Sequence, residues 1–122
     1  PLRLVGSEMC IRDRNADDER VKAVRTWLSQ NFSIKENPGM GPQGLYYYYH
    51  TMAKALSLSG TKKIQDANGK VRDWRKELAM ELINNQNPEG SWINENGRWW
   101  EKDPILVSCY AILSLERILY AF

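Results

Sequence analysis

The side chains best suited to chemistry gather in one aromatic run that ends at the only histidine of the chain, His50. Imidazole titrates near neutral pH, so His50 is either an acid–base group or a hydrogen-bonded histidine of the core. The tyrosines either line a cavity, since aromatic faces attract carbocations and suit isoprenoid surfaces, or serve in ordinary packing. Successive helical residues point about 100° apart, so at most two of the four tyrosines share one face. From this run we take Tyr46, Tyr48, Tyr49 and His50 as candidate cavity-lining residues.

A second aromatic pair, Trp99-Trp100, lies in a polar stretch that its Asn96-Gly97 turn signal predicts to be non-helical. Paired indole rings serve either as a platform for a sugar or lipid or as ordinary packing. We add both tryptophans to the candidate cavity-lining residues. Paired carboxylates for glycoside chemistry would have to come from Glu95 and Glu101, the only candidates nearby.

Four main helices are predicted to position these residues, over about 17–31, 45–58, 73–85 and 103–122. The first and third carry apolar residues at helical spacing on one face, whereas the second and fourth are apolar nearly all round and are expected to be buried. Four tyrosines in a row suit a strand by propensity, but the residues after them continue without a turn signal and favour a helix. We therefore predict an all-α fold with a possible small β-hairpin around 62–72, where Asn68-Gly69 is a tight-turn signal.

Local signals set the expected helix ends. Asn15 or Asp17 is the expected cap of the first helix, Asp73 that of the third and Asp103 that of the last, where Pro104 suits the first helical position. In the third helix we expect an apolar stripe of Trp74, Leu78 and Leu82 with Met80 and Ile83 alongside. The solvated face is expected to hold Arg75, Lys76, Glu77 and Glu81.

The alternation of amphipathic and apolar helices is also a repeat. Gln30 and Gln86 end the two amphipathic helices 56 residues apart. Residues 51–58 match residues 108–115 at an offset of 57, with a Thr/Ser pair and three identities. Two copies of a helix pair at a constant period predict a stacked helical array.

Residues 86–92, QNPEGSW, read Q-x3-G-x-W and resemble the QW repeat of the squalene–hopene cyclase and protein prenyltransferase superfamily. The resemblance covers 15–122. It implies repeats of outer helix, turn and inner helix that stack into an α/α toroid, with Gln86, Gly90 and Trp92 as the structural motif that ties neighbouring repeats together. It also implies an isoprenoid or other apolar ligand in a cavity lined by the inner helices. Two helix pairs do not close a ring, so we expect a fragment or a terminal cap of a longer bacterial-type protein, whose neighbouring repeats are its partners.

The catalytic motifs of that superfamily are not reproduced. Its cyclases protonate an alkene with Asp-x-Asp-Asp, and the nearest string here, residues 15–18, is assigned to helix capping. Its prenyltransferases bind zinc with an Asp and a Cys that precede a His, whereas Cys109 follows His50. We therefore predict no metal and no cofactor, and leave open whether a ligand is turned over. The alternatives are a non-catalytic binding or scaffold module and a carbohydrate-active α/α toroid, such as a polysaccharide lyase or hydrolase.

Charge and hydropathy limit the classes of partner that we expect. A net charge of +2 does not favour nucleic acid, and no apolar run reaches the roughly 18 residues that span a bilayer, although peripheral membrane contact stays open.

Residues 1–14, PLRLVGSEMCIRDR, resemble a translated sequencing adapter, the alternative being a natural flexible N-terminus. The predicted repeat domain is therefore residues 15–122.

Overall fold

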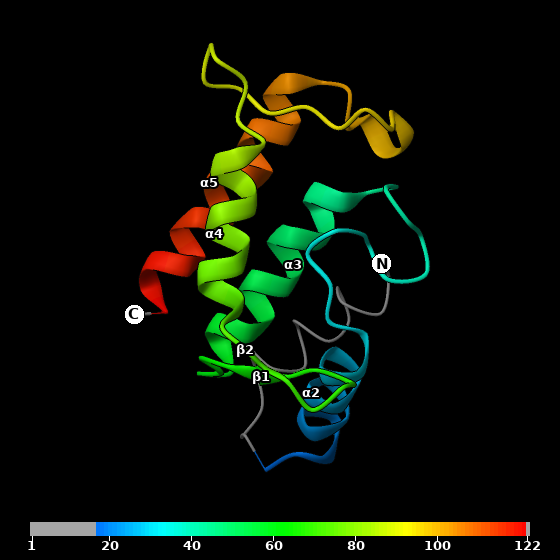
Figure 1. Ribbon diagram of the computed structural model, residues 1–122, viewed down its shortest axis with the longest axis vertical. Coiled ribbons are helices and arrows are strands. Elements are labelled where there is room, and N and C mark those ends of the chain that lie inside the picture. Colours follow the sequence, from blue (N-terminus) through cyan, green and yellow to red (C-terminus); the bar gives the residue numbers. More distant parts are fainter. Residues whose placement is uncertain (1–16, 122) are drawn as a thin grey trace.

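The computed structural model describes residues 17–121, which fold into four longer helices, one short 3₁₀ turn and one two-stranded sheet. The segment 1–14 and the expected cap Asn15 lie outside the described residues. In chain order the elements are α2 (Glu19–Asn31), α3 (Leu45–Leu58), β1 (Ile64–Gln65), β2 (Val71–Arg72), α4 (Trp74–Asn84), η1 (Arg98–Trp100) and α5 (Pro104–Tyr120). The predicted mainly helical character and the small hairpin are confirmed (Figure 1).

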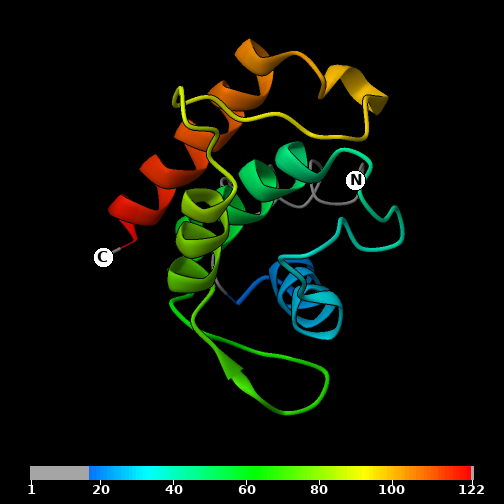
Figure 2. The ribbon, with the colours of Figure 1, turned by 45° about the horizontal axis from the view of Figure 1, so that its top comes forward.

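The two apolar helices, α3 and α5, pack against each other and run in the same direction, both downward in the view of Figure 1. The α4 helix begins at the opposite end, beside the hairpin, and runs antiparallel to them. After the molecule is turned, α3 is seen between α2 on one side and α4 and α5 on the other (Figure 2). This central position explains why an apolar sequence with four tyrosines folds as a helix, because α3 has packing partners on several sides.

The hydrophobic core is built around α3. Five of its side chains, each at most 1% exposed, belong to the main buried cluster: Tyr48, Tyr49, Met52, Ala53 and Leu56. The other helices each contribute a buried stripe to the same core: Leu28 of α2, Trp74, Leu78 and Leu82 of α4, and Val107, Ala111 and Ile118 of α5. The stripe of α4 recurs every four residues and that of α5 at intervals of four and seven, as expected for one helix face.

The predicted caps of α4 and α5 are confirmed. The carboxylate of Asp73 accepts a hydrogen bond from the Lys76 amide at 3.4 Å, and that of Asp103 accepts one from the Ile105 amide at 2.9 Å. The α2 helix differs from the prediction, because its cap is Asp18, which accepts from the Arg20 amide at 2.8 Å. The helix begins at Glu19, two residues later than predicted, so Asp18, directly before it, takes the capping position.

The predicted faces of α4 are partly wrong. Met80 and Ile83 were expected beside the apolar stripe, yet both side chains are more than half exposed. Arg75 was expected in solvent, yet it is buried and its guanidinium donates to Asp73 at 3.1 Å and to the Ala121 carbonyl at 3.1 Å. The last carbonyls of α5 lack helical partners, and this arginine supplies a donor to one of them.

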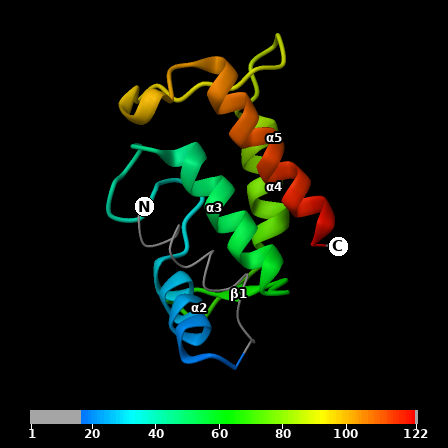
Figure 3. The ribbon, with the colours of Figure 1, turned by 180° about the vertical axis from the view of Figure 1, so that it is seen from behind.

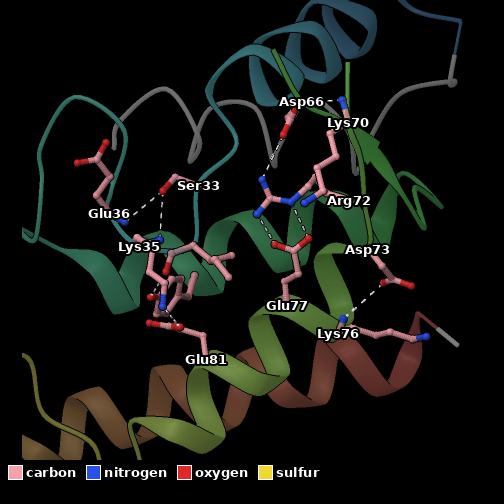
Figure 4. Close-up of polar contacts among 12 residues, drawn as sticks. Ser33, Lys35, Glu36, Asp66, Lys70, Arg72, Asp73, Lys76, Glu77 and Glu81 are labelled. Atoms are coloured by element: carbon pink, nitrogen blue, oxygen red, sulfur yellow. Dashed lines mark hydrogen bonds and ion pairs between the residues drawn. The ribbon is translucent and has the colours of Figure 1, made fainter. Parts of the chain in front are cut away.

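The hairpin is fastened to the helices through Arg72. Its guanidinium forms ion pairs with Asp66 at 3.2 Å and with Glu77, the latter also through an Nε hydrogen bond of 2.7 Å (Figure 4). The same group lies 5.2 Å from the ring centroid of Phe32, just after α2. Arg72 therefore links the sheet to both α4 and the end of α2.

Candidate functional site

Three of the sequence-predicted tyrosines lie in the core. The hydroxyl of Tyr48 donates to the Ser33 carbonyl at 2.8 Å, and that of Tyr49 donates to the Ile34 carbonyl at 2.6 Å. Burial raises the pKa of both phenols, and it raises that of Tyr46 to about 12 with help from the nearby carboxylate charges. Tyr48 and Tyr49 thus fasten the loop before α3 to that helix.

A second set of rings lies on the other side of α3, where α5 packs against it. The ring of Tyr110 is edge-on to that of Tyr47, with centroids 5.7 Å apart, and stacks on the imidazole of His50 at 6.0 Å. All three side chains are partly exposed. We call Tyr47, His50 and Tyr110 the aromatic cluster.

Sequence reasoning selected His50 but missed both of its aromatic neighbours. Tyr47 and His50 are three residues apart in a helix, a spacing that puts them on one face and was available as a signal. No local pattern connects them with Tyr110, which lies on another helix. Burial, the charge of Tyr47 and the charge of Glu101 raise the pKa of the Tyr110 phenol, so this ring stays neutral at physiological pH.

The aromatic cluster belongs to a longer surface, which we call the α3–α5 face. On α3 it continues along one helical stripe: Tyr47, His50 and Lys54. On α5 it continues along another: Leu106, Tyr110, Leu113 and Arg117. Because the two helices run side by side in the same direction, the face is aromatic near their beginnings and basic towards their ends.

The carboxylate of Glu101 lies at the beginning of α3, next to the backbone of Tyr47. It is fully buried and accepts hydrogen bonds from the backbone amides of Tyr46 at 3.2 Å and Tyr47 at 2.9 Å. The side-chain amide of Asn94 donates to it at 2.7 Å. The residue before α3, Gly44, adopts a φ of 62° and has no side chain to cap the helix, so Glu101 caps it from 55 residues away.

The two carboxylates considered for glycoside chemistry occupy different environments. Glu101 is buried and accepts hydrogen bonds from the first turn of α3, whereas Glu95 is exposed. His50 is the one sequence-predicted acid–base group that lies on the α3–α5 face. Stacking and apolar contact are therefore the chemistry for which this face is best built.

The η1 turn, which carries the tryptophan pair, lies at the outer edge of the molecule (Figure 3). The predicted non-helical stretch contains the single turn η1, in which Trp99 is 56% and Trp100 82% exposed. The guanidinium of Arg98 lies 4.9 Å from the ring centroid of Trp99. A Cβ added at Gly44 would lie 3.4 Å from Cδ1 of Trp99, so one edge of this ring covers the start of α3.

The QW-like turn joins α4 to α5 mainly through its tryptophan. The ring of Trp92 is buried, and its Nε1 donates to the Leu82 carbonyl at 2.7 Å near the end of α4. The backbone amide of Trp92 donates to Ser108 Oγ of α5 at 3.1 Å. The Gln86 side chain is exposed, and its amide donates to the carbonyl of Gly90 at 2.9 Å, a hydrogen bond within the turn itself. Gly90 has a φ of 94°, a conformation that suits glycine.

An open apolar groove of about 670 Å³ lies beside this turn, on the outer side of α5. Its main apolar walls are Ile93, Pro104, Ile105 and Ile112. The free thiol of Cys109 also lines it. We call this feature the α5 groove.

Among residues 17–121, no three His, Cys, Asp or Glu side chains gather in a way that would hold a metal ion. In the same range, no helix combines the length and apolar character needed to cross a bilayer. No protein-family model, curated protein or solved structure matches the chain.

Proposed function

We propose that residues 15–122 are a squalene cyclase/prenyltransferase-like repeat domain that binds an isoprenoid or other apolar ligand on the α3–α5 face. The observation that carries this proposal is the aromatic cluster, in which rings from two parallel apolar helices meet on a partly exposed surface. The helices α3 and α5 would be inner helices of the toroid, and α2 and α4 outer ones.

The chemistry of the face supports an apolar ligand. Aromatic rings offer large flat contact areas, and edge-to-face or stacked pairs hold those rings in fixed orientations. The hydroxyls and imidazole add a few polar groups to this apolar surface, which is the usual composition of small-molecule sites. Glu101 orders the beginning of α3 and thereby fixes the position of Tyr47.

We also propose that neighbouring repeats of the toroid pack on the outer side of α5. The α5 groove is apolar, and Met80 and Ile83 of α4 are exposed together with Leu119 of α5. Unpartnered apolar surface of this kind marks an interaction site in soluble proteins. A further helical hairpin of a longer chain would bury it in the same way that α4 and α5 cover α3.

A binding titration tests the ligand proposal. Farnesol would be titrated into the protein and into two matched variants of α5, Tyr110→Ala in the aromatic cluster and Tyr120→Ala outside it. Tyr120 is 74% exposed, so its removal controls for the loss of a tyrosine from the same helix. We expect Tyr110→Ala to weaken binding by about threefold to tenfold, since an aromatic contact contributes about 0.5–1.5 kcal/mol, and Tyr120→Ala to leave it unchanged.

Thermal melts of both variants show whether the fold is retained. Equal binding by the wild type and a folded Tyr110→Ala variant would contradict the site. Failure of the wild type to bind farnesol at all would favour the alternative of a non-catalytic scaffold, for which the exposed apolar side of α4 and α5 is the supporting observation.

A further inference from the structure

The stretch from Arg98 to Lys102 forms a protruding turn, which we call the tryptophan knuckle. It presents two large aromatic side chains to solvent, and Trp100 is the most exposed large hydrophobic residue among those described. The knuckle lies at the outer edge of the molecule, away from α4 (Figures 1 and 3). Exposed tryptophan next to exposed tryptophan is unusual for a surface that meets only water.

The backbone of the knuckle is strained. Trp99 and Trp100 both adopt positive φ angles, of 60° and 65°, which side chains with a Cβ rarely take. Such conformations cost about 1–3 kcal/mol each and persist only where surrounding contacts fix them. The next residue is Glu101, whose carboxylate is buried. The hydrogen bonds that it accepts from α3 hold the knuckle in place.

The knuckle exposes its basic side chains and buries its acidic one. Glu101 points inward and is fully buried, so its negative charge is withdrawn from the surface. Arg98 and Lys102 on either side are exposed. The next carboxylate, that of Asp103, caps α5 by accepting from the Ile105 amide. The tip therefore shows two indole rings flanked by two cations.

We propose that the tryptophan knuckle inserts into the headgroup region of an anionic phospholipid bilayer. Tryptophan is enriched at this depth because its ring is apolar while its N–H needs a polar partner. Flanking basic residues are attracted to anionic headgroups. A carbohydrate platform fits less well, since the guanidinium of Arg98 lies over the Trp99 ring that a sugar would stack on. The inference rests on the knuckle alone and stands independently of the proposed ligand.

Vesicle flotation of the full chain tests this inference. Vesicles of phosphatidylcholine with phosphatidylglycerol would be compared with vesicles of phosphatidylcholine alone, and we expect tighter binding to the anionic ones. The variant Trp100→Ala should bind at least about tenfold more weakly, because it removes most of the apolar area available for insertion. Its matched control is Ile105→Ala, a side chain of similar exposure on α5, which should bind like the wild type.

The depth and the charges of the contact have separate readouts. Brominated lipid should quench the tryptophan emission of the wild type and quench that of Trp100→Ala less. Arg98→Gln should reduce the preference for anionic vesicles, whereas Lys76→Gln, an exposed lysine on α4, should not. The inference is overturned if the wild type does not float with anionic vesicles, if Ile105→Ala loses binding as Trp100→Ala does, or if the knuckle binds a soluble polysaccharide instead.

Discussion

A single carboxylate, that of Glu101, organises the beginning of α3. Two backbone amides and the Asn94 side chain donate to it, so the buried charge is met by several donors and by the positive end of the helix dipole. Hydrogen bonds to a charged group are about twice as strong as neutral ones. The loop that carries the tryptophan knuckle is thereby tied to the helix that carries Tyr47.

Replacing Glu101 by Gln tests this anchor. The amide keeps the shape of the side chain but turns one acceptor into a donor that faces other donors. We expect the free energy of unfolding to fall by about 1–3 kcal/mol in urea denaturation, the usual penalty for buried polar groups left unsatisfied. The control Glu95→Gln, on an exposed carboxylate, should change it by less than about 0.5 kcal/mol. Equal stabilities of the two variants would contradict the anchoring role.

Trp92 is the second residue on which the local structure depends. We expect Trp92→Ala to lower the unfolding free energy by about 3–5 kcal/mol, since it removes a buried aromatic ring. Trp92→Phe should cost less, because it keeps much of the packing and loses the bond to the Leu82 carbonyl. Thermal and urea melts measure both. Trp100→Ala is the matched control, and a Trp92→Ala variant as stable as that control would remove the structural role given to the QW-like turn.

At the scale of elements, α3 is stabilised by tyrosines that must stay neutral. The folded pKa of Tyr46 is raised to about 12 from its ordinary value of 10.0, and those of Tyr48 and Tyr49 are raised by burial as well. A group with a raised folded pKa contributes stability that is complete below its unfolded pKa and is lost as pH rises towards the folded one. Stability should therefore decline above about pH 10.

An alkaline titration followed by tyrosinate absorbance and circular dichroism checks this expectation. The buried tyrosines of α3 should ionise only together with the loss of helical signal. Ionisation of every tyrosine near pH 10 with the helices intact would show that these side chains are not buried as described.

The ends of the helices were largely predictable from the sequence, because capping is a local effect. Asp73 and Asp103 lie directly before their helices and bond to amides two or three residues later. The orientation of α4 was not predictable to the same degree. Whether Arg75 or Met80 faces the core depends on where α5 lies, and a helix with apolar residues on more than one side gives no unique answer.

At the scale of the whole molecule, the α3–α5 face and the α5 groove are two of the surfaces that the described helices leave open. They lie on different sides of α5, and only the first combines rings from two helices. The sequence identified His50 but not this juxtaposition, since Tyr110 reaches it through the packing of α5 on α3. The position of Trp99 and Trp100 at the surface likewise follows from the Glu101 anchor, which no local pattern reveals.

The most direct test of the account is to map where an apolar ligand binds. Farnesol would be added to isotope-labelled protein, and changes in the nuclear magnetic resonance shifts of backbone amides and aromatic rings would be followed residue by residue. We expect the largest changes at Tyr47, His50 and Tyr110. Changes concentrated at Ile105 and Ile112 in the α5 groove, or no localised changes at all, would contradict the claim that the α3–α5 face is the ligand-binding surface.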